Sequence, residues 1–225
     1  MNPGPLDKAQ WPYVGLVRSY FPGLGGQAAG ATGTLINPRV ILTAGHVVYD
    51  PSRGGYPTVV NVELGGRQPF AVESTVFRTT RPWVDTDSKT MNPISAFDVG
   101  AILLDSPIPA TDVASVSVAV TPGPNLGGLE LNVVGFPVRP DLFGTLYGAR
   151  STPTLLAPAL DLYRIFYPIV TLAGMSGGPV YTRDASSGRI LLRGVHTSLY
   201  NGMGSGLRIT EGIAKLIQSW IREVS

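Results

Sequence analysis

The sequence predicts an all-β protein with one α-helix at the C-terminal end. Short alternating or apolar runs, broken by Gly, Pro, Asn and Asp, recur about twelve times along the chain. The 28 glycines and 20 prolines supply turns between these runs. The chain has 225 residues, of which 44% are hydrophobic, so it can bury the core of either one β-rich domain or two small, closely packed barrels.

The predicted strands fall into two groups of six. The early group lies near residues 13–21, 31–36, 40–43, 58–64, 70–79 and 99–104. The late group lies near residues 129–136, 145–155, 162–169, 179–182, 190–198 and 206–209. The stretch between them is rich in proline and glycine. We therefore predict an N-terminal barrel over residues 1–110, an inter-barrel linker over 111–128, and a C-terminal barrel with the terminal helix over 129–225.

The last residues follow a helical rather than a strand pattern. Thr210 is suited to cap a helix, because its hydroxyl can accept a hydrogen bond from a free backbone N–H. Apolar residues then recur with the spacing of one helical face: Ile213, Leu216, Ile217, Trp220 and Ile221. We expect this face to pack on a barrel.

Composition excludes several classes of function. The 17 basic and 15 acidic residues are spread along the chain, which argues against a nucleic-acid partner. No apolar run approaches the roughly 18 residues needed to cross a bilayer, so no membrane partner is expected. There is no cysteine, and the two histidines lie far apart in the sequence. We therefore expect neither a metal nor a cofactor, although a weak calcium site formed by aspartates stays open.

The start of the chain carries no cationic stretch followed by an apolar one. We expect a secreted bacterial protein whose signal or pro-segment is absent from this chain, with a cytoplasmic protein as the alternative. The lack of cysteine is compatible with both compartments.

Two short motifs carry the chemistry. His46 lies in Leu42-Thr43-Ala44-Gly45-His46-Val47, and Ser176 lies in Gly174-Met175-Ser176-Gly177-Gly178-Pro179-Val180. A serine hydroxyl is a weak nucleophile unless a base within hydrogen-bond reach removes its proton, and histidine is the usual base. With two histidines in the chain, His46 is the leading candidate.

A base of this kind needs a carboxylate to orient it. Asp98 stands directly before the apolar run 99–104 and is the predicted partner of His46. Asp105, at the other end of that run, is the rival, but at ~3.3 Å per residue the strand would carry it ~20 Å away. Gly174 allows the backbone to turn so that its N–H and that of Ser176 point at one oxyanion.

These three motifs, in the order His46, Asp98, Ser176, resemble those of the chymotrypsin-like serine endopeptidases. The order differs from that of α/β-hydrolases, where Ser comes first, and of subtilisins, where Asp comes first. The resemblance implies an all-β fold of two six-stranded antiparallel Greek-key β-barrels packed together, with a C-terminal α-helix. It also implies that His46 and Asp98 come from the first barrel and Ser176 from the second. Met175 departs from the vertebrate digestive members, which carry Asp there. The chain is more similar to the cysteine-poor bacterial branch that includes the glutamyl endopeptidases.

The resemblance to that branch also implies a specificity pocket. His196 matches the imidazole that receives the substrate carboxylate, and Thr171 matches the hydroxyl that assists it. The alternative for His196 is an ordinary strand histidine bonded to backbone or water, and for Thr171 an ordinary β-branched strand residue. Thr197 matches the hydroxyl that commonly bonds the triad carboxylate.

The resulting prediction is a monomeric serine endopeptidase that cleaves protein or peptide substrates after Glu, and less readily after Asp. Two alternatives remain. One is a protease of another specificity acting as a cytosolic effector, and the other is an inactive binding module on the same fold.

Overall fold

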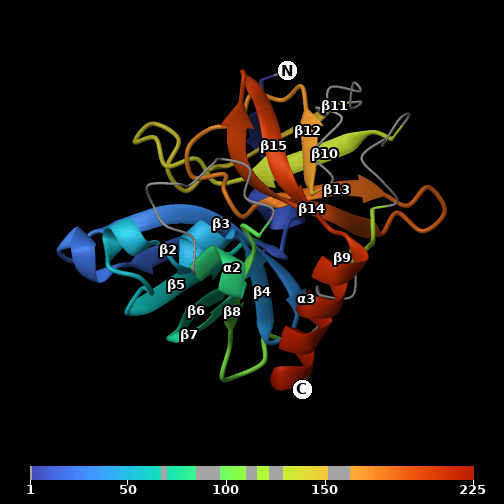
Figure 1. Ribbon diagram of the computed structural model, residues 1–225. Coiled ribbons are helices and arrows are strands. Elements are labelled where there is room, and N and C mark those ends of the chain that lie inside the picture. The colour runs from blue at the N-terminus through green and yellow to red at the C-terminus, as the bar shows by residue number, and fades with distance from the viewer. Residues whose placement is uncertain (1, 67–69, 85–96, 110–115, 122–128, 152–162) are drawn as a thin grey trace.

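The computed structural model describes residues 2–66, 70–84, 97–109, 116–121, 129–151 and 163–225. Two curled, mainly antiparallel sheets make up the molecule, and one long helix follows them (Figure 1). The predicted fold class is confirmed. In Figure 1 the blue to green strands from β2 to β8 form the lower sheet, and the yellow to red strands from β10 to β15 belong to the upper one.

The first sheet has seven strands. Their spatial order is β6 (Phe70–Ser74), β5 (Val59–Leu64), β2 (Val14–Tyr20), β3 (Ala28–Asn37), β4 (Val40–Thr43), β8 (Gly100–Leu103) and β7 (Val76–Thr79). β2, β3 and β4 are consecutive, and β5 returns to lie beside β2, which is the Greek-key order. The two outermost strands, β6 and β7, are joined through Thr75 alone, so the sheet has to curl on itself.

Residues 70–79 were expected to form one strand and instead form two, which explains the seventh strand. Ser74 causes the break. Its hydroxyl donates to the carbonyl of Leu103 at 2.5 Å and accepts from the N–H of Val76 at 3.0 Å. These bonds turn the chain at Thr75 from one edge of the sheet to the other.

The second sheet has eight strands. The path runs β1 (Gly4–Leu6), β11 (Leu146–Ser151), β10 (Leu131–Gly135), β13 (Pro179–Arg183), β14 (Ile190–Tyr200), β15 (Met203–Arg208) and β12 (Arg164–Tyr167), and β9 (Val116–Val118) pairs with β14. Six of these strands are the predicted late group. β1 and β9 are additions that the sequence pattern did not predict.

Both additions correct the predicted division of the chain. β1 lies within residues 1–110, yet it pairs with β11 of the second sheet, where it covers an otherwise open edge. β9 lies within the predicted linker 111–128, but it runs parallel to β14 as a short strand. Most other residues of the predicted linker lie outside the described ranges. A boundary near residue 110 stays a prediction.

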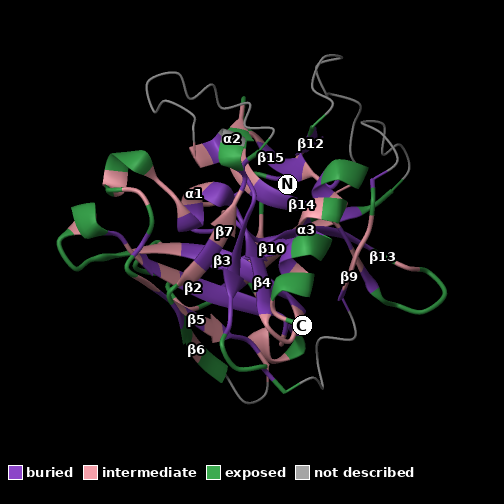
Figure 2. Ribbon diagram, turned by 60° about the horizontal axis from the view of Figure 1, so that its bottom comes forward, coloured by how far each residue is buried: buried purple, intermediate pink, exposed green. Residues whose placement is uncertain are grey.

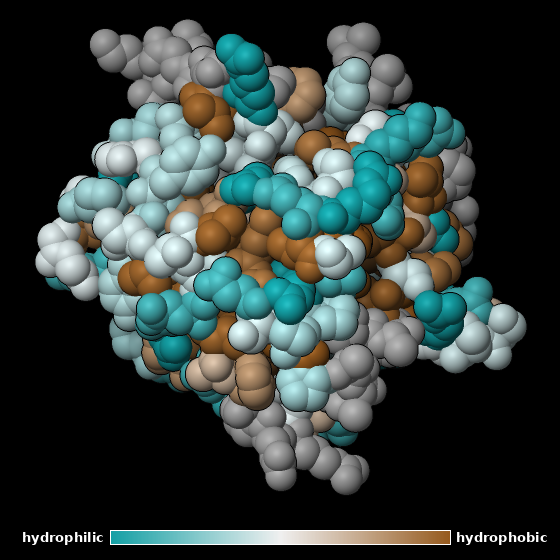
Figure 3. All heavy atoms as spheres, turned by 90° about the horizontal axis from the view of Figure 1, so that it is seen from below, coloured by the Kyte–Doolittle hydropathy of each residue, from teal (hydrophilic) through white to brown (hydrophobic). Residues whose placement is uncertain are grey.

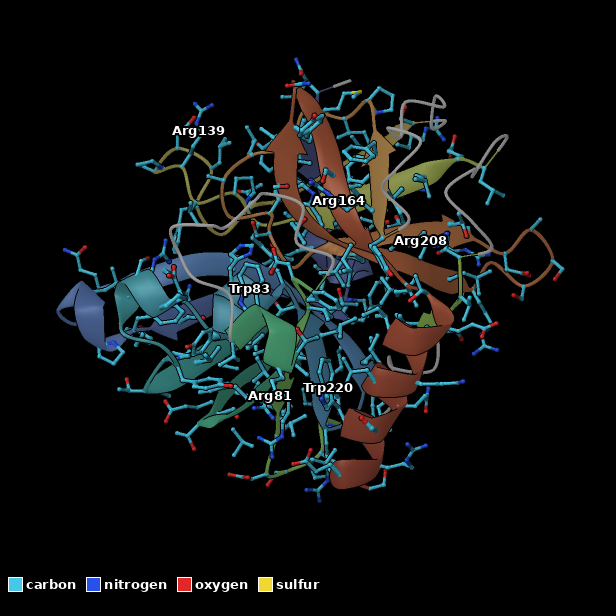
Figure 4. All side chains as sticks on the ribbon, viewed as in Figure 1. Arg81, Trp83, Arg139, Arg164, Arg208 and Trp220 are labelled. Carbon is cyan, nitrogen blue, oxygen red and sulfur yellow. The ribbon has the colours of Figure 1, made fainter. Side chains whose placement is uncertain are left out.

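The C-terminal helix α3 (Glu211–Glu223) begins as predicted, because the Thr210 hydroxyl accepts a hydrogen bond from the N–H of Ile213 at 3.3 Å. Ile217 and Trp220 are buried in the same hydrophobic core as residues of both sheets. The helix runs back along the first sheet beside β4 (Figures 1 and 4). Arg78 on β7 forms an ion pair with Glu223 at the far end of the helix.

Burial follows the strand pattern. Figure 2 shows the buried residues concentrated where the two sheets meet, with exposed residues at the outer turns. On the face seen from below, hydrophilic and hydrophobic side chains are interspersed (Figure 3). Among the described residues, no helix combines the length and apolar character of a membrane span.

Candidate active site

His46 stands where the first sheet meets the second. β4 ends at Thr43, and the chain enters the one-turn helix α1 (Gly45–Val48), which carries His46. The side chain of His46 keeps 32% of its surface exposed. Trp83, labelled in Figure 4, lies near His46, with the centroids of the two rings 6.4 Å apart. The Nε1–H of Trp83 donates a hydrogen bond to the Tyr49 carbonyl at 3.1 Å.

Asp98 holds His46 through both oxygens of its carboxylate. His46 Nδ1 lies 2.9 Å from Oδ2 and 3.1 Å from Oδ1 of Asp98. The backbone N–H of His46 also donates to Oδ1 at 3.0 Å. Asp98 is buried, with 5% of its surface exposed. The carboxylate therefore fixes both the ring and the backbone of His46, which leaves Nε2 as the nitrogen that is able to exchange protons.

The surroundings of His46 change its basicity. Burial lowers the pKa, but the charge of Asp98 and its hydrogen bond raise it more, with a further contribution from Asp50. The result is a pKa above the ordinary value of 6.5. A base with a raised pKa is better able to accept a proton from a weak acid such as a hydroxyl.

Ser176 lies on a tight turn that glycines make possible. Gly174 and Gly177 have φ angles of 93° and 86°, a region that residues with a side chain rarely adopt. A Cβ on Gly174 would lie 2.6 Å from the carbonyl oxygen of Phe136, and one on Gly177 would run into the Thr32 carbonyl oxygen. The hydroxyl of Ser176 lies 3.3 Å from the Thr197 carbonyl oxygen.

The N–H groups around Ser176 divide into two sets. Those of Met175, Gly177 and Gly178 donate to backbone carbonyls at 3.1, 2.7 and 3.0 Å. Within the described part of the chain, those of Gly174 and Ser176 donate to no protein group. Two neighbouring unpaired donors are what a developing oxyanion requires.

Thr32, a buried residue of β3, ties the Ser176 turn to the first sheet. Its N–H donates to the Ser176 carbonyl at 2.8 Å, and its hydroxyl donates to the Gly174 carbonyl at 2.9 Å. The same hydroxyl accepts from the N–H of Phe136 at 2.9 Å. Sequence analysis missed this residue, because a threonine in a strand has no signature that separates structure from function.

His46, Gly174 and Ser176 line one cleft of about 430 Å³. Its other walls come from both halves of the chain: Ser19, Phe21, Ala28, Ala29, Gly30, Ala31, Val47, Arg53, Val138 and Ala173. The structure thus brings the predicted base, nucleophile and one oxyanion residue to the same opening. It does not place Thr171 or His196 on the lining of this cleft.

His196 lies on β14 and is 2% exposed. Its Nδ1 is 2.5 Å from the hydroxyl of Tyr167, which is fully buried on β12. Burial raises the pKa of Tyr167 well above 10, while the charge of Arg164 lowers it, so the phenol keeps its proton. When the phenol donates to Nδ1, the ring proton of His196 lies on Nε2. Sequence analysis missed Tyr167 as well.

The environment keeps His196 neutral. Burial, reinforced by the charge of His46, lowers its pKa to about 3, and a hydrogen bond with the Ser205 backbone opposes this shift. Arg164 also lowers the pKa of His196, which places its cation within electrostatic range. Figure 4 shows Arg164 within the second sheet, and its guanidinium donates to the hydroxyl of Ser198 at 3.0 Å.

The hydroxyls of Thr171 and Thr197, both predicted site residues, differ in their hydrogen bonds. Thr171 is buried, and its hydroxyl has no hydrogen-bond partner among the described residues. The Thr197 hydroxyl donates to the Ser205 carbonyl at 3.4 Å rather than to Asp98. The expected contact of Thr197 with the carboxylate is therefore wrong. The bulge in β14 between His196 and Ser198 turns Thr197 out of the regular register.

Within the described ranges, no three His, Asp or Glu side chains gather closely enough to hold a metal ion.

A protein-family model described as Trypsin matches residues 7–132. An extracellular metalloprotease of Bacillus subtilis (strain 168) is 30% identical over 197 residues, which cover 86% of this chain and 59% of that protein. A glutamyl endopeptidase of Bacillus licheniformis is 30% identical over 196 residues, covering 84% and 58%. The chain thus spans less than two thirds of the length of either relative.

Solved structures share the fold. A Glu endopeptidase in complex with MPD superposes with a TM-score of 0.74 at 24% identity, covering 96% of this chain and 95% of that one. The protease Anisep from Arthrobacter nicotinovorans superposes with a TM-score of 0.71 at 19% identity, covering 93% and 95%.

Proposed function

Because the chain belongs to the trypsin family, we propose that it is a serine endopeptidase in which Ser176, His46 and Asp98 form the catalytic triad. The observation that carries this proposal is the position of His46. One side of its ring is held by Asp98 at 2.9 Å, and the ring borders the same cleft as Ser176.

The chemistry follows from this geometry. His46 Nε2 takes the proton of the Ser176 hydroxyl as the oxygen attacks the substrate carbonyl, and the unpaired N–H groups of Gly174 and Ser176 stabilise the resulting oxyanion. The imidazolium is stabilised by the Asp98 carboxylate and gives its proton to the leaving amine. The acyl group stays on Ser176 as an ester. Water, activated by His46, then hydrolyses the ester and restores the serine.

We further propose that the enzyme prefers Glu, and less so Asp, before the cleaved bond. Three features support this. His196 has a ring N–H whose hydrogen bond a carboxylate would accept in place of the Ser205 backbone, Thr171 offers a hydroxyl with no partner among the described residues, and Arg164 supplies a positive charge within electrostatic range. A relative with 30% identity is named a glutamyl endopeptidase. The neutral His196 contributes a hydrogen bond rather than a full charge.

The triad is tested by active-site labelling. A fluorophosphonate probe, which esterifies an activated serine, should label the protein at Ser176, and Ser176→Ala should abolish labelling and lower turnover by several orders of magnitude. Thermal unfolding of the variant should match that of the unchanged protein. A protein that is not labelled and does not cleave a mixed peptide library would instead be a binding module on the same fold.

The Glu preference has its own test. His196→Ala should reduce the ratio of kcat/KM for a Glu substrate over its Gln counterpart, because the two differ in charge but hardly in size. An unchanged ratio with intact turnover would dismiss the pocket and leave the triad standing.

We propose secretion as the setting, since one relative is named an extracellular protease. Detection of the protein in the culture medium of its host would support this, whereas retention in the cytoplasm would favour an intracellular effector. The proposed enzyme acts as a monomer, which light scattering in solution would test.

A further inference from the structure

We infer that Thr79 and Thr80 are positioning residues for the proposed catalytic triad, because their two hydroxyls hold the backbone on either side of Asp98. This inference rests on the proposed serine endopeptidase function and adds to it the element that fixes the acidic member of the triad. Neither threonine lines the cleft beside Ser176, so both act through Asp98 and not on the substrate.

The carboxylate of Asp98 depends on its own backbone for its position. Within the described part of the chain, the hydrogen bonds that reach its two oxygens all come from His46. Thr197, the expected second partner, donates to the Ser205 carbonyl instead. His46 is the group that Asp98 has to orient, so the fixed point of this pair must lie in the chain segment that carries Asp98.

That segment begins where the backbone ladder between β7 and β8 stops. Thr79 pairs with Gly100 at the last step of the ladder. The chain before Gly100 bends, with the N–H of Val99 donating to the Phe97 carbonyl at 2.7 Å, so Asp98 lies outside the ladder. A buried carbonyl without a donor is costly, and the carbonyl of the fully buried Val99 therefore needs a partner other than a strand.

The two threonine hydroxyls supply the missing donors. Thr79 Oγ1 donates to the Val99 carbonyl at 2.8 Å, and Thr80 Oγ1 donates to the Phe97 carbonyl at 3.1 Å. The residues on both sides of Asp98 are thereby bound to the end of β7. Two anchored neighbours restrict the rotation of the Asp98 backbone, and with it the direction of the carboxylate.

Trp83 extends the same arrangement to the helix that carries His46. The short helix α2 (Arg81–Val84) follows Thr80, whose hydroxyl also accepts from the N–H of Trp83 at 3.2 Å. The indole Nε1–H of Trp83 donates to the carbonyl of Tyr49, the residue that ends α1. The end of β7 and α2 are thus bonded both to the segment that carries the acid and to the helix that carries the base.

Gly45, the residue before His46, shows how closely these groups approach one another. A Cβ on Gly45 would lie 3.1 Å from both Thr79 Oγ1 and Trp83 Cδ1. It would also lie 3.2 Å from Asp98 Oδ1. The threonine hydroxyl, the indole and the carboxylate therefore surround one point of the backbone, and this close packing couples the position of Thr79 to that of Asp98.

The test removes the hydroxyls and keeps the shapes of the side chains. Thr79→Val and Thr80→Val should each lower kcat by about tenfold, and the double variant by about 10²-fold, because misplacing a catalytic group by about 1 Å has an effect of that size. KM should change by less than about twofold, since neither residue touches the substrate. Thr79→Ser and Thr80→Ser keep a hydroxyl and should retain most of the activity, which a packing role alone would not predict.

A nuclear magnetic resonance titration measures the same effect without turnover. The chain has two histidines, and the pKa of His196 is lowered to about 3, so the imidazole that titrates above 6.5 belongs to His46. Burial and Arg53 lower the pKa of His46, whereas Asp98 and Asp50 raise it. A loosened Asp98 raises it less. The pKa of His46 should therefore fall in the double valine variant, and the acidic limb of the kcat/KM profile should move to lower pH with it.

Thr121→Val is the matched control. Thr121 is a buried threonine whose hydroxyl donates to the Arg193 carbonyl at 2.8 Å, and it bonds no residue of the triad. The change removes the same kind of hydrogen bond as Thr79→Val. It should lower the midpoint of thermal unfolding to a similar extent and leave kcat and the pKa of His46 unchanged.

The outcomes separate this inference from the proposed function. Equal kcat in the double valine variant and in Thr121→Val, with an unchanged pKa of His46, would overturn the role of the two threonines and leave the serine endopeptidase intact. A rise in KM at constant kcat would overturn that role as well. If the double variant does not fold, the two single variants carry the same comparison.

Failure of the proposed function has a different signature. An unchanged protein that neither reacts with a fluorophosphonate nor hydrolyses peptides would overturn the serine endopeptidase function. The titration of His46 would then still decide whether Thr79 and Thr80 hold Asp98, because it needs no turnover.

Discussion

The N–H of Thr32 and the carbonyl of Ser176 form a 2.8 Å hydrogen bond that joins the two sheets at the nucleophile. The Thr32 hydroxyl adds two more bonds to the second half of the chain, at Gly174 and Phe136. Ser176 is therefore positioned by the first sheet as well as by its own turn. His46 follows β4 of the same sheet, and Thr32 lies on β3. These two neighbouring strands therefore set the distance between His46 and Ser176.

Replacing Thr32 by Val keeps the shape of the side chain and removes its hydroxyl. We expect the free energy of unfolding to fall by about 1–3 kcal/mol, because the N–H of Phe136 would be left buried without an acceptor. We also expect kcat to fall more than KM changes, since the Gly174 carbonyl loses the bond that holds the oxyanion turn. Urea denaturation and steady-state kinetics measure the two effects.

Thr58→Val is the matched control for this change. The Thr58 hydroxyl bonds the Tyr20 carbonyl at 3.0 Å on an exposed part of the first sheet, so its loss should change stability little. Equal effects of the two substitutions on kcat would contradict the role assigned to Thr32.

Asp98→Asn should lower kcat by about 10⁴-fold, because the amide favours the wrong tautomer of His46 and no longer stabilises the imidazolium. The acidic limb of the pH profile should also move to lower pH, since the charge of Asp98 is a cause of the raised pKa of His46. Asp105→Asn, at the exposed end of the same strand, should leave both unchanged. A small effect of Asp98→Asn on kcat would exclude Asp98 from the triad.

Tyr167→Phe removes the hydroxyl that faces His196 Nδ1 and keeps the ring. The proton of His196 is then free to occupy either nitrogen, so we expect the ratio of kcat/KM for Glu over Gln substrates to fall by about tenfold. Turnover of the Gln substrate should change much less. Tyr56→Phe, at an exposed tyrosine, serves as the control. If Glu and Gln substrates were affected equally, Tyr167 would have only a packing role.

The low pKa of His196 predicts acid sensitivity. A histidine with a folded pKa of about 3 and an ordinary value of 6.5 is protonated in the unfolded chain but not in the folded one between these values. Its contribution to stability is complete above pH 6.5 and is lost as the pH falls toward 3. His46 acts in the opposite sense, losing its contribution as the pH rises above 6.5.

We therefore expect the free energy of unfolding, measured in urea between pH 4 and 6.5, to decline with acid more steeply in the unchanged protein than in His196→Gln. The slope for one such group approaches about 1.4 kcal/mol per pH unit. Parallel curves for the two proteins would show that His196 is able to take up a proton in the folded state.

Removing metal ions tests the proposed serine mechanism against a metal-dependent one, because one relative is named an extracellular metalloprotease. Ser176 chemistry needs no metal, so dialysis against EDTA should leave peptidase activity unchanged, while a fluorophosphonate should abolish it. Loss of activity in EDTA that added zinc restores would contradict the serine mechanism.

The fold class and the central pair of the site could be predicted from the sequence because their signals are local. His46 and Ser176 lie in short motifs, Asp98 begins an apolar run, and Thr210 precedes a helical apolar stripe. All twelve predicted strand regions that the structure describes contain strands. These features depend on spacing within a few residues, which the sequence displays directly.

The remainder depends on contacts between distant segments. Thr32 and Tyr167 look like ordinary strand residues until the partner strand is in place. β1 has only three residues, and its pairing with β11 has no periodic signal to reveal it. For Thr197 the sequence predicted a contact with Asp98 that the structure does not contain. The register shift in β14 places its hydroxyl next to the Ser205 carbonyl instead.

The packing of α3 has a consequence for biosynthesis. Ile217 and Trp220 belong to the core that strands near the start of the chain also build, and Glu223 pairs with Arg78. The ribosome makes these residues after every strand of both sheets, so the first sheet keeps part of its apolar face uncovered until residue 220 has been synthesised. The core shared by the two sheets is therefore completed only after the second sheet has been synthesised.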